Sequence, residues 1–138
     1  MALRAAFDTR FVFALFNPES GKQEEWCKSV IRESRNSGSY VVASTVTLAE
    51  LYENMGRLVG VETVRLRIAS MINNKIGFVP VDRAVAERAG RLKLSSNFEL
   101  PLSDAIIAAT AELHAAGRVL TDDPHFGRIS GLEPVWIR

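Results

Sequence analysis

The sequence predicts an α/β fold in which a doubly wound central parallel sheet lies between two layers of helices, as a three-layer α/β/α sandwich. Short apolar runs of strand length alternate with longer stretches whose apolar residues recur at helical spacing. Turn-forming residues separate the two kinds of segment, and this alternation is typical of parallel sheets with helices on both faces. The length of 138 residues, with no linker rich in Pro, Gly or Ser, predicts a single domain over residues 1–138.

The first half of the chain predicts two strands separated by a helix. Residues 3–7 are an apolar run that ends at Asp8 and predicts a strand, and a second apolar run, 11–16, stops at Asn17-Pro18. Residues 22–37 predict a helix that Gly38 terminates. Residues 40–43 are rich in β-branched and aromatic side chains, which favours a strand, and a helix then runs from Thr47 to Gly60.

The second half continues the alternation. Helical spacing predicts a helix over residues 64–72, and the run 76–79 predicts the third strand before Pro80. Helices over 82–94 and 103–115 follow, then a strand over 118–121, one helical turn at Asp123-Pro124 and a last strand over 134–137. In open sheets of this kind, ligands bind beyond the carboxyl ends of the strands, so we expect chemistry in the residues that follow each strand.

The composition is that of an ordinary globular domain, with 47% hydrophobic residues, 24% charged residues and a net charge of +1. The single cysteine, Cys27, cannot form an internal disulfide, and it favours a reducing, cytoplasmic setting. We expect no membrane span, because no stretch approaches about 20 apolar residues. The near-zero charge excludes a broadly basic surface, so any binding of nucleic acid has to depend on a local site.

Acidic residues stand at several of the expected places. Asp8 follows the first strand, Glu50 lies early in the helix after the second strand, Asp104 begins a helix, and Asp122 and Asp123 follow the fourth strand. Carboxylates gathered at one end of a sheet repel one another, and a cation that binds oxygen relieves the repulsion. The combination of these acids therefore favours a metal site.

Each acid also fits a purely structural role. The stretch from Thr47 to Glu50 matches a capping box, in which the Glu50 side chain bonds the backbone at the helix start. Asp8 and Asp123 suit N-cap positions, and Asp104 suits the positive end of a helix dipole. Taken singly, the structural explanation of each acid is the stronger one.

Four segments carry motifs: Phe-Asp-Thr at 7–9, Thr-Leu-Ala-Glu-Leu at 47–51, Leu-Ser-Asp-Ala-Ile-Ile-Ala-Ala-Thr-Ala at 102–111 and Val-Leu-Thr-Asp-Asp-Pro-His-Phe at 119–126. In order and spacing, these segments resemble the motifs of the PIN-domain family, in particular those of its VapC-type toxins. The likeness covers nearly the whole chain, and its third and fourth motifs are the most specific. It implies a PIN-like fold and an endoribonuclease that depends on Mg²⁺ or Mn²⁺. The implied catalytic metal ligands are Asp8, Glu50, Asp104 and Asp123.

The resemblance also implies supporting residues. The hydroxyl residues Thr9, Ser103 and Thr121 match positions that support the acids or their waters. Asp123 aligns with the fourth acid of the family, and Asp122 is the alternative. Arg10 departs from the Asn or Ser that the family often has there, and it either alters hydrogen bonding around the acids or places a cation near the substrate phosphate.

Three other residues near these motifs have competing interpretations. His125 lies close to the expected site, but a structural role is favoured over that of a general acid. Histidine and cysteine ligands would favour zinc, and the sequence clusters neither type. Trp26 and Trp136 are expected in the core rather than as platforms for stacked bases.

The function that the resemblance implies is that of the toxin in a type II toxin–antitoxin pair, hydrolysing RNA phosphodiester bonds. Its expected partners are a small antitoxin protein and a second copy of the chain in a homodimer. The apolar residues Leu51, Met55, Leu58 and Val59 are candidates for such a surface, although core packing explains them equally well. Two alternatives remain: a housekeeping PIN nuclease of RNA processing or decay, and a non-catalytic RNA- or protein-binding module of the same fold.

Overall fold

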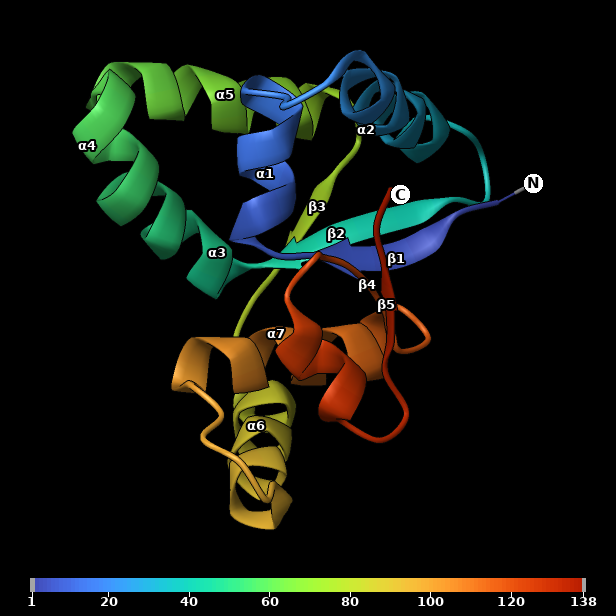
Figure 1. Cartoon of the computed structure of the whole chain (residues 1–138), viewed down its shortest axis with the longest axis vertical. Helices are drawn as coiled ribbons and strands as arrows, with labels where there is room; N and C mark the ends of the chain where they lie inside the picture. Colours follow the sequence, from blue (N-terminus) through green and yellow to red (C-terminus); the bar gives the residue numbers. More distant parts are fainter. Residues whose placement is uncertain (1, 138) are drawn as a thin grey trace.

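A five-stranded parallel sheet forms the middle layer of the computed structural model, which describes residues 2–137 (Figure 1). The strands are β1 (Arg4–Phe7), β2 (Tyr40–Ser44), β3 (Gly77–Val79), β4 (Arg118–Leu120) and β5 (Glu133–Val135). Their spatial order is β3-β2-β1-β4-β5, and every neighbouring pair is parallel. The chain thus extends outward from β1 to one edge and then returns to the other side of β1, which confirms the predicted doubly wound sheet.

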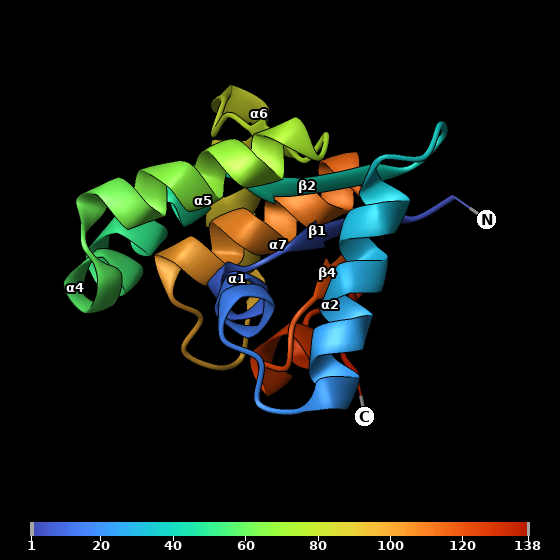
Figure 2. The same cartoon turned by 90° about the horizontal axis from the view of Figure 1, so that it is seen from above.

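Helices cover both faces of this sheet, as Figures 1 and 2 show. One layer contains α1 (Thr9–Phe16), α2 (Gly21–Ser34) and α5 (Val61–Asn73). The opposite layer contains α6 (Arg83–Ser95), α7 (Leu102–His114) and the short 3₁₀ helix η2 (Pro124–Arg128). The predicted α/β/α sandwich is therefore present, and the apolar run at 11–16 is part of a helix.

The two faces of the sheet have different cores, because successive side chains of a strand point to opposite sides. In β1, Ala5 and Phe7 belong to the core under α1 and α2, whereas Ala6 belongs to the core over α7. The first core contains most of the aromatic side chains. The second core is rich in alanine along α7, so the backbone of this helix lies close to β1 and β2.

The connection from β2 to β3 corrects one predicted boundary. The helix expected from Thr47 begins earlier, as α3 (Thr45–Glu50), because the Ser44 hydroxyl accepts a hydrogen bond from the Val46 N–H at 3.1 Å and acts as the N-cap. It continues as a π-helical turn, η1 (Leu51–Met55), and as α4 (Gly56–Val59). The capping box expected at Thr47 is therefore wrong, and Glu50 lies at the end of α3.

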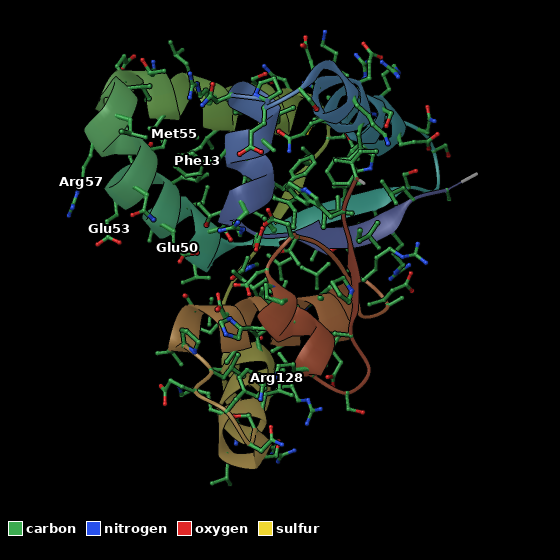
Figure 3. The ribbon with its side chains drawn as sticks, in the orientation of Figure 1. Phe13, Glu50, Glu53, Met55, Arg57 and Arg128 are labelled. Atoms are coloured by element: carbon green, nitrogen blue, oxygen red, sulfur yellow. The ribbon has the colours of Figure 1, made fainter. Side chains whose placement is uncertain are left out.

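Of the four apolar residues that were candidates for an interaction surface, two are buried and two are exposed. Leu51 and Met55 are buried in the core, so they do not form a surface. Leu58 is 73% exposed, and Val59 is also exposed. In Figure 3, Met55 lies toward α1 and Phe13, while Glu53 and Arg57 point away from the molecule.

Two further features bear on the expectations from the sequence. Cys27 is buried, and burial raises the pKa of its thiol to about 11, so the thiol is protonated at neutral pH. Among residues 2–137, no helix is both long and apolar enough to span a bilayer.

Candidate metal centre

The expected acids lie where the winding of the sheet reverses. β1 and β4 are neighbours, but the chain leaves them toward opposite faces, through α1 and η2 respectively (Figure 1). Asp8 follows β1, and Thr121 to Asp123 follow β4. The carboxyl ends of two such strands form the usual ligand crevice of a doubly wound sheet.

Asp8 is fixed by three hydrogen bonds. As the N-cap of α1, it accepts bonds from the backbone N–H groups of Arg10 at 3.1 Å and Phe11 at 3.3 Å. Its other oxygen accepts a bond from the Thr121 hydroxyl at 2.6 Å. Asp8 is only 5% exposed, and this burial raises the pKa of its carboxyl to about 7, although the hydrogen bonds act in the opposite direction. The predicted cap is confirmed, but capping does not explain why a carboxylate is buried here.

Asp104 and Asp123 come together from the third and fourth sequence motifs. Oxygen atoms of both residues and a ring nitrogen of His125 all lie within 4.8 Å of one another. Asp104 lies in the first turn of α7, and Asp123 is the N-cap of η2, accepting a bond from the His125 N–H at 2.9 Å. Burial, followed by the charges of Asp123 and Glu50, raises the pKa of Asp104 to about 6. The protein thus leaves these negative charges close together.

Glu50 is held by a residue from another segment. The Thr9 hydroxyl donates a hydrogen bond to a Glu50 carboxylate oxygen at 2.9 Å, and this bond joins α1 to the end of α3. The Glu50 charge also contributes to the raised pKa of Asp104. Figure 3 shows Glu50, the last residue of α3, beside the carboxyl end of the sheet and between the two helical layers.

Thr121 connects the two halves of the cluster. Its hydroxyl donates to Asp8 and accepts a hydrogen bond from the Asp123 N–H at 3.0 Å, and the side chain is buried. The structure therefore brings the four acids to one end of the sheet. Asp104 and Asp123 lie within 4.8 Å of one another, Thr121 joins Asp8 to the Asp123 backbone, and Thr9, next to Asp8, bonds Glu50. Ser103 precedes Asp104 in the first turn of α7, which is the position that the sequence predicts.

Asp122 lies just outside this cluster. It forms an exposed two-bond ion pair with the Arg10 guanidinium, which binds through its Nε atom and through Nη2 at 3.1 Å. The hydrogen bond from Arg10 holds the pKa of Asp122 below its ordinary value. The hydrogen bond to Asp122, and more weakly the charges of Asp8 and Asp123, raise the pKa of the Arg10 guanidinium. The unusual Arg10 thus neutralises Asp122 and stands at the edge of the cluster.

His125 lies beside Asp123 and is held there by two contacts. Its Nδ1 atom lies 3.0 Å from an Asp123 oxygen, and its ring is stacked on Phe98 with an interplanar angle of 9°. The Arg128 guanidinium lies 4.2 Å from the centre of the same Phe98 ring, on the layer below the sheet (Figure 3). The only sequence signal for this placement is the tight turn at Asp123-Pro124, which returns the next residue toward Asp123.

The donor set fits a divalent cation. Within residues 2–137, no lysine or arginine forms an ion pair with Asp8, Glu50, Asp104 or Asp123. A set of carboxylate oxygens with unbalanced charge suits a hard cation such as Mg²⁺ or Mn²⁺. Chemically, such a site can polarise a phosphate or a bound water.

The chain is similar to one family and to several solved structures. The model of the PIN domain family matches residues 5–132, which is nearly all of the chain. A search of curated proteins finds no match.

Three solved structures share this fold. VapBC2 from Rickettsia felis, bound to a DNA fragment from its promoter, has a TM-score of 0.72 at 14% identity, over 96% of this chain and 97% of that chain. VapC20 from Mycobacterium tuberculosis, a toxin that cleaves the sarcin-ricin loop, has a TM-score of 0.72 at 18% identity, over 94% and 97%. FitAcB from Neisseria gonorrhoeae has a TM-score of 0.69 at 22% identity, over 94% and 95%.

Proposed function

This chain belongs to the PIN-domain family, and on that premise we propose that it is a metal-dependent endoribonuclease that hydrolyses phosphodiester bonds in RNA. The observation that carries the proposal is the cluster of carboxylates at the reversal of the sheet. Asp104 and Asp123 lie within 4.8 Å of one another, and the Thr121 hydroxyl joins the Asp8 carboxylate to the backbone N–H of Asp123. The carboxylates repel one another unless a positive charge lies between them, and the RNA phosphate also carries a negative charge that has to be neutralised. A divalent cation bound at the cluster would meet both needs.

Mg²⁺ or Mn²⁺ is the proposed cofactor, held by Asp8, Glu50, Asp104 and Asp123. A bound divalent cation neutralises charge on the scissile phosphate and lowers the pKa of an attacking water. We assign the principal contacts to Asp8 and Asp104, because burial raises the pKa of both carboxyls and a cation would reverse that effect. His125 is a further candidate ligand beside Asp123.

Neighbouring hydroxyl groups orient these acids. Thr121 fixes one Asp8 oxygen and two backbone N–H groups fix the other, so this carboxylate has a single orientation. Thr9 fixes Glu50 in the same way. Asp123 is preferred to Asp122 as the fourth acid, because Asp122 is already paired with Arg10 outside the cluster.

The biological role that we propose is that of a toxin in a toxin–antitoxin pair. The fold is that of VapC20, which is a toxin, and of the matching chains in the VapBC2 and FitAcB structures. Leu58, Val61 and Leu66 are exposed apolar side chains on α4 and α5, and they provide a surface for a small antitoxin or for a second copy of the chain.

The first experiment tests for cleavage. Purified protein is incubated with mixed unpaired RNAs and Mg²⁺ or Mn²⁺, and the cut positions are mapped. We expect cleavage that EDTA abolishes and that Asp104→Asn reduces by at least about 1000-fold, since metal-ion stabilisation contributes several kcal/mol. The matched control is Asp82→Asn, which changes an exposed acid that caps α6 and is not one of the proposed ligands. Cleavage that is insensitive to EDTA would contradict the proposal.

The second experiment tests the toxin role. Induced expression should stop bacterial growth, and co-expression of a small protein encoded by the neighbouring reading frame should restore it. Growth arrest that persists in the Asp104→Asn variant would show that the effect does not depend on cleavage.

A further inference from the structure

A pocket of ≈ 520 Å³ lies beside the carboxylate cluster, and no residue of the proposed metal set lines it. It is formed by α1, the start of α2, the π-helical turn η1, the loop after β4 and the residue after β5. Its volume lies within the range of about 300–1,000 Å³ that is usual for small-molecule sites, and it can hold a nucleoside.

This pocket is continuous with the cluster through shared residues. Thr9, which binds Glu50, also lines the pocket, and so do both members of the Arg10–Asp122 ion pair. Two groups therefore separate the pocket from the metal ligands: the Thr9 hydroxyl and an exposed ion pair. Exposed ion pairs are weak, so an anionic substrate can attract the guanidinium of Arg10 away from Asp122.

The walls of the pocket suit a base rather than a second phosphate. Phe13 and Trp136 provide aromatic surface, and Asn17, Gln23 and Asn54 provide amide groups. The Trp136 ring packs edge-on against Trp26, with their centroids 5.0 Å apart, so its position is fixed by the core while it lines the pocket. Single-stranded RNA is recognised by aromatic stacking together with hydrogen bonds to the edges of its bases.

The polar groups of the pocket are fixed as well. Gln23 is only 8% exposed, and its Oε1 atom accepts a hydrogen bond from the Glu19 N–H at 2.8 Å. This bond leaves the Gln23 amide N–H groups as the donors that a ligand can use. Glu19 and Asp122 carry negative charge and Arg10 carries positive charge, so the formal charge of the lining is −1. A phosphate inside the pocket is therefore disfavoured, whereas a neutral base with N–H donors is accepted.

We propose that this pocket binds the base of an unpaired nucleotide next to the scissile phosphate, with Arg10 at the rim contacting the phosphate backbone. This inference rests on the proposed function, because it assumes an RNA substrate at the carboxylate cluster. The pocket thereby selects the base at one position beside the cut and restricts cleavage to single-stranded RNA.

Tryptophan fluorescence tests the pocket in EDTA, where no cleavage occurs. Each of the four mononucleotides is titrated into the Trp26→Phe variant, which leaves Trp136 as the only tryptophan. We expect at least one of them to quench the Trp136 fluorescence in a saturable way. In Trp136→Phe, which leaves Trp26 outside the pocket, the quenching should fall at least threefold. Free tryptophan controls for absorption by the nucleotide. Equal quenching in the two variants, or none in either, would overturn the proposal.

The base preference of cleavage provides the second test. In mapped digests by the parent protein, one position beside the cut should show a preferred base. Asn17→Ala and Asn54→Ala should change the ratio of cleavage at preferred and other bases by about fivefold or more. This ratio does not depend on the fraction of folded protein. The matched control is Asn36→Ala, an exposed residue in the turn before β2, and it should leave the ratio unchanged.

The two tests separate the pocket from the proposed activity. If the parent protein cuts no RNA but nucleotides quench Trp136, the proposed function is wrong, whereas the pocket still binds nucleotides. If cleavage occurs but neither asparagine variant changes its base preference, the pocket is not a substrate site. Quenching by an arginine-rich peptide and not by nucleotides would overturn the proposal in favour of a cationic side chain from a protein partner.

Discussion

Asp122 and Asp123 are adjacent in the chain, yet they lie in two regions with opposite electrostatics. Asp122 is exposed and paired with Arg10, which holds the pKa of its carboxyl below the ordinary value. Asp123 turns the other way, toward Asp104, and its charge helps to raise the pKa of that acid to about 6. One region is neutralised by the protein itself, and the other is not.

The difference shows how a cation site can be distinguished from an ordinary surface ion pair. An exposed acid with an arginine partner is satisfied without any ligand, and such pairs contribute little to stability. Buried acids that raise the pKa of one another destabilise the fold unless they take up protons or a cation. The predictions below test this contrast, from the largest expected effect to the smallest.

The largest difference is expected between substitutions at these two positions. Asp123→Asn should reduce metal-dependent cleavage by about 1000-fold, because it removes a proposed ligand. Asp122→Asn should reduce it by less than about tenfold, because it only releases Arg10. The measurement is the single-turnover rate on one mapped RNA at saturating Mg²⁺ or Mn²⁺. A larger loss of cleavage in Asp122→Asn than in Asp123→Asn would show that Asp122, and not Asp123, is the fourth acid.

The carboxylate cluster, which has no lysine or arginine partner, should make the stability of the protein depend on pH. The folded pKa values of Asp8 and Asp104, about 7 and about 6, lie above the ordinary value of 3.8, so the metal-free folded protein binds more protons than the unfolded chain between these values. Stability must then fall as the pH rises from about 4 to about 8. We expect the Tm in EDTA to be lower at pH 8 than at pH 5 by about 5 °C or more.

Two controls connect that pH profile to the cluster. Mg²⁺ or Mn²⁺ should raise the Tm at pH 8, because a cation compensates the charges. Asp8→Asn should flatten the profile in EDTA, since the amide carries no charge and can keep its bonds as the α1 cap. An equally steep profile in this variant would show that Asp8 is not its cause.

A smaller effect is expected from the hydroxyl that orients the acids. Thr121→Val keeps the shape of a buried side chain but removes its bonds to Asp8 and to the Asp123 N–H. Groups that orient metal ligands typically contribute 10–100-fold, so we expect a decrease of about tenfold or more in affinity for Mn²⁺, measured by titration calorimetry. Unchanged affinity would show that Asp8 and Asp123 do not depend on this bridge.

The smallest effect is expected at an acid that caps a helix and does nothing else. Asp82 accepts a hydrogen bond from the Val85 N–H at 3.0 Å and is exposed, unlike Asp8. Asp82→Ala should lower the free energy of unfolding by about 1 kcal/mol, as is usual for the loss of a cap. Denaturant melts should show this loss without any change in Mn²⁺ affinity.

The sequence predicted the arrangement of the fold better than the boundaries of its elements. Alternating apolar runs indicated the parallel sheet, because a buried strand has to be apolar on both faces. The start of α3 was wrong by two residues, since both Ser44 and Thr47 can cap a helix and the sequence does not show which hydroxyl meets a free N–H. The π-helical turn after Glu50 has no sequence signature that we could use.

The candidate site shows a similar division. The four acids were predicted from their positions after strands and from their motifs, and the structure places them at one end of the sheet. The stacking of His125 on Phe98 was not predictable, because the loop that carries Phe98 reaches the turn that carries His125 only in three dimensions. The pocket beside the cluster was missed for the same reason, and Trp136, expected in the core, also lines it.

The hydrogen bond between Thr121 and Asp8 joins positions 113 residues apart. The ribosome synthesises the chain from its N-terminus, so α1 and Asp8 emerge long before the strand that completes their surroundings. Contacts of such long range form late, because a large loop must close before they can contribute. A nascent chain therefore cannot assemble this carboxylate cluster until β4 has left the exit tunnel, so the proposed metal site is completed only near the end of translation.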